Sequence, residues 1–138
     1  LDLGCGIGVP SCKLLSEAGL PVTGVDISST MLSHARHSVP RAEFIEADML
    51  PHVPDSGAAS IDAVVVYFSM IGHVGQEDIR NFFRHARALL KADGIFIYAS
   101  APLEGDQILA RWMDRDVPCS SFTTEDTLAE IRAAGFEV

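Results

Sequence analysis

The sequence predicts an α/β fold, built as one doubly wound, mainly parallel sheet with helices on both faces. Segments that read as strands alternate with segments that read as helices along the whole chain, and this alternation favours parallel strands joined by right-handed crossovers. The run IDAVVVYF at 61–68 is β-branched almost throughout, as in central strands covered on both faces. Because the 138 residues contain no repeat, low-complexity tract or linker, we expect a single domain over 1–138.

The first part of the chain is expected to supply three strands and two helices. LDL is apolar and runs into a glycine, as at the end of a buried strand. The next segment has apolar residues at helical spacing, with Pro10 in its first turn and Gly19 just past its end. In order, we expect a strand at 1–3, a helix at 9–18, a strand at 21–27, a helix from Ser28 or Ser29 to about 39, and a strand at 42–48.

The second part of the chain continues the alternation. An apolar stripe of helical period predicts the helix before Gly94, and Gly135 is a stop signal for the last helix. In order, we expect a strand at 61–68, a helix at about 76–91, a strand at 95–100, a helix at 106–113, a helix at 123–135, and a strand that begins at 136.

Charge and cysteine content restrict the possible partners. Nineteen acidic against ten basic residues give a formal net charge of −9, which is no footprint for nucleic acid or an anionic membrane, so we expect a small-molecule partner. Cys5, Cys12 and Cys119 form no CxxC and no Cys/His cluster. They predict buried, reduced thiols in a cytoplasmic protein without a metal site.

A glycine-rich turn follows the first strand. A strand, a glycine turn and a helix together place backbone N–H groups at the carboxyl edge of the sheet, where ligands bind. The glycines have the pattern G-x-G-x-G, and Val9 stands where a dinucleotide fingerprint needs its third glycine. Asp2 precedes the turn, where a carboxylate can fix the loop or reach a ligand ammonium but would add little to a phosphate site.

Two further carboxylates end the next two strands. Asp26 closes the second strand and Asp48 the third. The carboxyl ends of parallel strands meet at one edge, so both side chains and the glycine turn should converge on one crevice. There Asp26 could accept hydrogen bonds from both ribose hydroxyls of a nucleoside, and Asp48 one from an adenine amino group.

These motifs carry a family resemblance. LDLGCGIG, GVDIS, FIEADM, DAVVVYFSMIGHV, ALLKADGIFIYAS and AAGFEV, in this order, resemble a class I S-adenosylmethionine-dependent methyltransferase, whose fold is Rossmann-like. The resemblance covers nearly the whole chain. Members of that family usually have a helical segment before the first strand and an antiparallel hairpin at the end. We therefore expect this chain to be a partial domain, truncated at both ends.

The resemblance implies S-adenosyl-L-methionine as cofactor and assigns roles to eleven residues. Asp26 would hold the ribose, or it might cap the next helix; Asp48 would meet the adenine amino group, or it might be a turn residue. Met49 would flank the adenine, or it might belong to the core. The remaining assignments are Asp2 near the cofactor's amino group, Gly4, Cys5, Gly6 and Gly8 around its methionine part, Ile27 beside the adenine, and Tyr67 and Phe68 near the sulfonium.

The expected activity is methyl transfer to a small-molecule acceptor. The sulfonium is already activated, so the enzyme chiefly aligns the acceptor, and a base helps only a hydroxyl or protonated amine. His73 is the candidate base, with a structural role as the alternative. The sequence YFSM after the fourth strand lacks the Asn/Asp-Pro-Pro-Tyr-like motif of nucleic-acid amino methyltransferases.

The acceptor side is less well defined. Trp112, Met113 and Phe122 could line an apolar acceptor pocket, or the first two could simply pack a helix onto the sheet. Two other functions stay open: a nicotinamide-dependent oxidoreductase, which Val9 and Asp2 disfavour, and a non-catalytic module that binds the cofactor. The sequence leaves the oligomeric state unknown.

Overall fold

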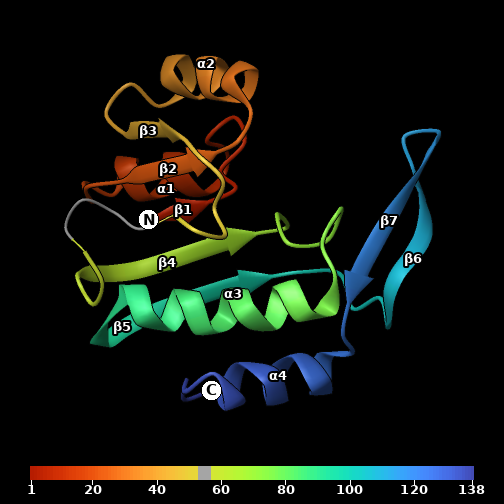
Figure 1. Cartoon of the computed structure of the whole chain (residues 1–138). Coiled ribbons are helices and arrows are strands. Elements are labelled where there is room, and N and C mark those ends of the chain that lie inside the picture. The colour runs from red at the N-terminus through yellow and green to blue at the C-terminus, as the bar shows by residue number, and fades with distance from the viewer. Residues whose placement is uncertain (53–56) are drawn as a thin grey trace.

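The computed structural model describes residues 1–52 and 57–138. Five parallel strands form one sheet in the order β3-β2-β1-β4-β5, so the doubly wound α/β prediction is confirmed (Figure 1). The elements are β1 (Asp2–Leu3), α1 (Ser11–Glu17), β2 (Thr23–Asp26), α2 (Ser29–Ser38), β3 (Glu43–Glu46), β4 (Ile61–Tyr67), α3 (Gln76–Leu89), β5 (Leu90–Ala99), β6 (Gly105–Trp112), β7 (Arg115–Ser121) and α4 (Thr124–Ala133).

Helices cover both faces of the sheet. Successive side chains of a strand point to opposite faces, and the apolar residues separate accordingly into two clusters. On one face, α3 and α4 pack over Val64 and Val66 of β4. On the other face, α1 and α2 close a smaller cluster around Cys12 and Leu32. In Figure 1, α3 lies across β4 and β5, while α2 lies at the β3 end of the sheet.

The helix boundaries follow the local signals. Gly19 has φ +83° after α1, and Gly135 has φ +94° after α4; both glycines allow the left-handed turn that ends a helix. The Ser28 hydroxyl accepts a hydrogen bond from the N–H of Met31 at 3.3 Å, and Thr123 caps α4 in the same way. These caps confirm the predicted starts of both helices.

The helix predicted at 106–113 is wrong. Residues 105–121 form an antiparallel hairpin, β6–β7, whose two-residue turn is Met113–Asp114. Both turn residues have positive φ, +48° and +60°, as in the turns that match the twist of a two-stranded ribbon. Ile108 and Trp112 are four residues apart, which places them on one face of a helix. The same spacing also places them on one face of a strand, because strand side chains alternate with a period of two. Without an Asn-Gly or Asp-Gly pair, the sequence gives no strong sign of this turn.

The strand predicted from residue 136 is not formed either. Residues 136–138 have no regular structure, and Phe136 stacks on Phe96 of β5 with ring centroids 4.8 Å apart. All three cysteines are free and buried, as predicted. In the described residues, no helix is long and apolar enough to cross a membrane, and no cluster of three or more metal-binding side chains is found.

Candidate functional site

The glycine loop is fastened to the end of β2. The N–H groups of Gly4 and Cys5 both donate to the carbonyl of Val25, at 2.8 and 3.0 Å. Gly4 and Gly6 have φ +74° and +54°, a region in which residues with a side chain are strained. The loop is therefore a fixed backbone surface at the carboxyl edge of the sheet.

Asp26 is the residue that holds this loop to the next helix. Its Oδ2 accepts a hydrogen bond from the N–H of Gly6 at 2.8 Å, and its Oδ1 accepts one from the N–H of Ser28 at 2.9 Å. A carboxylate has about four acceptor positions, so both oxygens can still accept from ligand hydroxyls. Ser28, rather than Asp26, caps α2.

The three glycines of the loop serve different purposes. A Cβ on Gly4 would collide with the side chain of Ser69 and lie 3.3 Å from the Sδ of Met49, and one on Gly8 would press on Val39 and Phe44 below α2. A Cβ on Gly6 would meet no atom within 4 Å. Gly4 and Gly8 are thus needed for packing, whereas Gly6 borders open space in which a ligand could lie against the backbone.

Asp2 lies beneath the loop rather than on its surface. Only 2% of it is exposed, and its Oδ2 accepts a hydrogen bond from the Cys12 thiol at 3.1 Å. Burial raises the pKa of the Asp2 carboxyl, and the bond from Cys12 partly offsets this. The hydrogen bond with Cys5, together with burial, raises the pKa of the Cys12 thiol well above its usual range, so this thiol is unreactive.

The ends of β3 and β2 contribute a turn and two apolar side chains. Asp48 Oδ1 accepts from the N–H of Leu50 at 3.0 Å, which makes Asp48 the turn residue of the alternative interpretation; its spare acceptor positions leave the adenine assignment a prediction. Met49 packs against the main core and also borders Gly4. Ile27, directly after Asp26, is 73% exposed. An apolar side chain left open beside polar loop atoms is typical of a ligand site.

The segment after β4 closes the site on its other side. Tyr67 and Phe68 are about half exposed and stand edge to face, 5.0 Å apart. Sequence reasoning missed Ser69, whose hydroxyl donates to the carbonyl of Leu3 at 2.8 Å. This bond, with the contact of Ser69 against Gly4, holds the start of the segment after β4 against the glycine loop. The only sequence signal for it was a small residue after the apolar run. His73 is exposed and has φ +63°.

The β6–β7 hairpin stands beside this segment. Gly72 pairs with Cys119, and the N–H of His73 donates to the carbonyl of Pro118 at 3.0 Å. The predicted acceptor pocket of Trp112, Met113 and Phe122 is not formed. Phe122 is buried in the core under the guanidinium of Arg80, while Trp112 and Met113 lie exposed at the hairpin tip.

Comparison with known proteins agrees with this geometry. Residues 1–94 match the family described as a methyltransferase domain. The chain belongs to the methyltransferase domain family. The resemblance to S-adenosylmethionine-dependent methyltransferases is thereby confirmed, and with it S-adenosylmethionine as the cofactor of the family's fold.

Individual relatives of this methyltransferase domain include both curated proteins and solved structures. A putative methyltransferase of Bacillus subtilis is 33% identical over 102 residues, which cover 71% of this chain and 40% of that protein. A trans-aconitate 2-methyltransferase of Paracidovorax citrulli is 46% identical over 61 residues, covering 43% of this chain and 23% of that protein. The structure of an S-adenosylmethionine-dependent methyltransferase from Mesorhizobium loti superposes with a TM-score of 0.73 at 23% identity, over 99% of this chain and 72% of that one.

The extent of these matches limits what they establish. The chain spans less than half the length of either curated relative. The likeness to the Mesorhizobium structure establishes the Rossmann-like fold. Proteins with this fold catalyse many different reactions. The roles of the individual site residues rest on the geometry described above and stay predictions.

Proposed function

We propose that this chain is a domain, spanning 1–138, that binds S-adenosylmethionine and transfers its methyl group to a small-molecule acceptor in the cytoplasm. The observation that carries the proposal is the bond between Gly6 and Asp26 beside open space. A backbone edge, a half-buried carboxylate with spare acceptor positions and the exposed Ile27 lie together there. This set suits a nucleoside with a cationic amino-acid tail better than a diphosphate, because the loop adjoins the carboxylates of Asp2 and Asp26.

This arrangement suggests which residues would contact each part of the cofactor. The bound cofactor supplies an activated methyl group. Asp26 would accept from the ribose hydroxyls, and Ile27 and Met49 would cover the faces of the adenine, with Asp48 at its edge. Gly4, Cys5, Gly6 and Gly8 would form the wall around the methionine part, with the Asp2 carboxyl buried beneath them on the side of the cofactor's amino group.

The acceptor would approach from the side of Tyr67 and Phe68. Their half-exposed rings would shield one side of a bound ligand from water and could stack on an apolar acceptor. His73 is the only titratable side chain in the described loop between β4 and α3, so we propose it as the base for a hydroxyl or amine acceptor. Its exposure lets it exchange a proton with solvent.

Isothermal titration with S-adenosylmethionine and S-adenosylhomocysteine tests the cofactor directly. We expect binding that Asp26→Ala weakens by about 100-fold, since two charge-assisted hydrogen bonds are worth roughly 3 kcal/mol. Glu46→Ala, at the exposed end of the neighbouring strand β3, is the matched control and should bind as the wild type does. A folded chain without affinity for either ligand would overturn the proposal.

Two alternatives are distinguished by the same material. A nicotinamide-dependent oxidoreductase would enhance NADH fluorescence on mixing, which we do not expect because Val9 replaces the third glycine of that fingerprint. A non-catalytic module would bind S-adenosylmethionine and transfer no methyl group to any member of an acceptor panel. Trans-aconitate belongs in that panel because of the relative from Paracidovorax citrulli.

A further inference from the structure

The N-cap position of helix α3 has no side chain that could accept a hydrogen bond from the first turn. Its N-cap residue is Gly75, which has no side-chain acceptor. Asp78 turns back to accept from the N–H of Gly75 at 2.8 Å. The next N–H, that of Gln76, is satisfied from outside the helix by Oδ1 of Asp106 in the hairpin, also at 2.8 Å. A carboxylate at this position also interacts favourably with the helix dipole.

Asp106 is at the same time tied into the base of the hairpin. The Ser120 hydroxyl donates to the same Oδ1 at 3.0 Å and accepts from the N–H of Gln107 at 2.9 Å. The side-chain amide of Gln76 donates to the carbonyls of Ser121, at 2.9 Å, and Gly105, at 3.3 Å. Strand and helix therefore exchange hydrogen bonds in both directions at this one junction.

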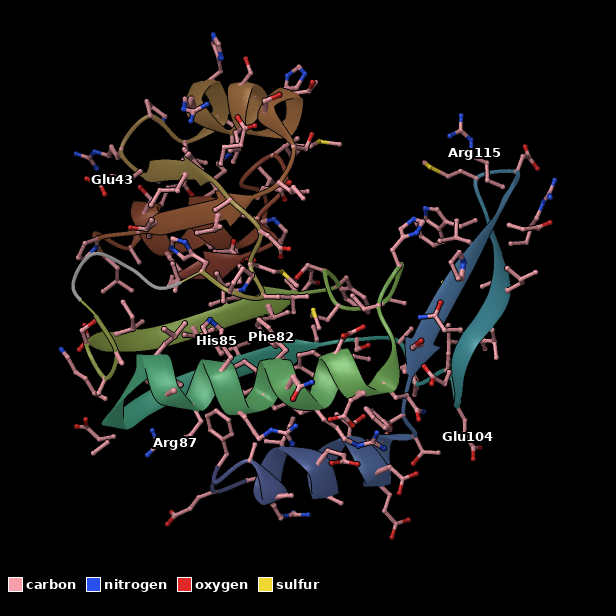
Figure 2. All side chains as sticks on the ribbon, viewed as in Figure 1. Glu43, Phe82, His85, Arg87, Glu104 and Arg115 are labelled. Carbon is pink, nitrogen blue, oxygen red and sulfur yellow. The ribbon has the colours of Figure 1, made fainter. Side chains whose placement is uncertain are left out.

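Further contacts of the hairpin lead to the segment after β4. The N–H of Ser120 donates to the carbonyl of Ile71 at 2.9 Å, and that of His73 to Pro118. Among the described residues, the far end is bonded only within the hairpin, through Arg111. Figure 2 shows Arg115 projecting there, while Glu104 lies near the base. Leu109, Trp112 and Met113 are between 69% and 85% exposed. The orientation of the whole hairpin, an arm formed by residues 105–121, thus depends on its base.

We propose that Asp106 is a positioning residue for acceptor recognition. By capping α3 from the hairpin, it fixes the arm against the segment that carries Phe68 and His73, so that the arm forms a standing wall of the acceptor side and not a mobile flap. This inference rests on the proposed function for its consequence in catalysis. The hydrogen bonds between the hairpin base and α3 form a clamp, and the clamp can be measured without any acceptor.

Hydrogen exchange and tryptophan fluorescence report on the clamp in the complete chain. In Asp106→Ala, the protection of the Gln76 and His73 amides should fall about tenfold, as for the loss of a charged helix cap. Trp112 is the only tryptophan, so its nanosecond anisotropy should reveal added motion of the arm. Asp106→Asn keeps Oδ1 as an acceptor and should restore most of both signals.

The control is Asp116→Ala on the same hairpin. Asp116 pairs with Arg111 at 3.1 Å, and both side chains are more than 60% exposed, so its removal should change neither signal. If Asp106→Ala does not fold, Gln76→Ala removes the side-chain half of the junction, its bonds to Ser121 and Gly105, and should give the same loss of protection at the His73 amide. Equal exchange and anisotropy in the Asp106→Ala and Asp116→Ala chains would overturn the proposal.

Ligand measurements separate this inference from the proposed function. The dissociation constant of S-adenosylhomocysteine should stay within twofold in Asp106→Ala, because the glycine loop is not involved. With an acceptor from the panel, KM for that acceptor should rise at least fivefold and kcat should fall less. An unchanged acceptor KM would refute the role in recognition, whereas absence of cofactor binding in the wild type would defeat the proposed function alone.

Discussion

The two sides of the site are built in opposite ways. Several of the bonds that hold the glycine loop span 10 to 20 residues, such as Gly6 to Asp26 and Cys12 to Asp2, and most of the loop residues are buried or half-buried. The hairpin is held at its base by bonds across long stretches of chain, and its tip is exposed. One side is thus a compact cradle with little room for change. The other is an arm whose outer residues are exposed and contribute little to the fold; under the proposed function they would face the acceptor.

The largest expected effect tests how tightly the cradle is packed. Gly4→Ala adds a methyl group that overlaps Ser69 at a left-handed φ, so we expect a loss of about 3 kcal/mol from strain and overpacking together. Chemical denaturation measures it. Ser69→Gly in the same chain should recover part of the loss. If the Gly4→Ala chain is as stable as the wild type, the residues around Gly4 can shift to accommodate the methyl group.

Gly6→Ala sharpens the comparison within the loop. It meets the same left-handed strain but no neighbouring atom, so stability should fall by only about 1 kcal/mol. Its methyl group, however, would occupy the open side of the loop. We therefore expect titration calorimetry to give at least a tenfold weaker affinity for S-adenosylhomocysteine, and unaltered affinity would show that the ligand does not lie there.

The buried carboxyl of Asp2 predicts a dependence of stability on pH. Burial raises its pKa in the folded chain above the unfolded value, so its favourable contribution is fully present below the unfolded pKa and is lost as pH rises through the folded pKa. Asp2→Asn should therefore gain stability over the wild type at pH 8, and the difference should vanish in acid. Denaturant midpoints at several pH values would check this, and a difference independent of pH would contradict it.

A smaller effect is expected at the turn of the arm. Met113 has φ +48° and a side chain 85% exposed, so it has strain without compensating contacts. Met113→Gly should stabilise the chain by about 0.5 kcal/mol, because glycine adopts this φ freely. Met113→Ala keeps the strain and serves as control. Thermal unfolding should rank the glycine variant highest; a loss of stability would indicate that the methionine packs on something.

The smallest effect concerns the exposed strand of the arm. Leu109 is 73% exposed, and Leu109→Ser should change the free energy of unfolding by no more than about 0.5 kcal/mol. Cofactor affinity should be equally unaffected. A clear change in acceptor KM with unchanged stability would support the distinction between cradle and arm, while a large loss of stability would abolish it.

The sequence alone determined the cradle and most of the alternation of strands and helices. The loop glycines, Asp26 and the cap at Ser28 belong to one motif, in which the hydrogen bonds of Asp26 and Ser28 span at most 20 residues, so residue type and order indicate their geometry. Tertiary structure determined the conformation of the arm. The segment at 106–113 fits a helical period as well as a strand, and only pairing with 115–121 and the bonds to Gln76 select the strand. The contacts of Ser69 and Asp106 join residues distant in the chain, and such contacts leave no pattern in local sequence because they arise only once the elements have packed.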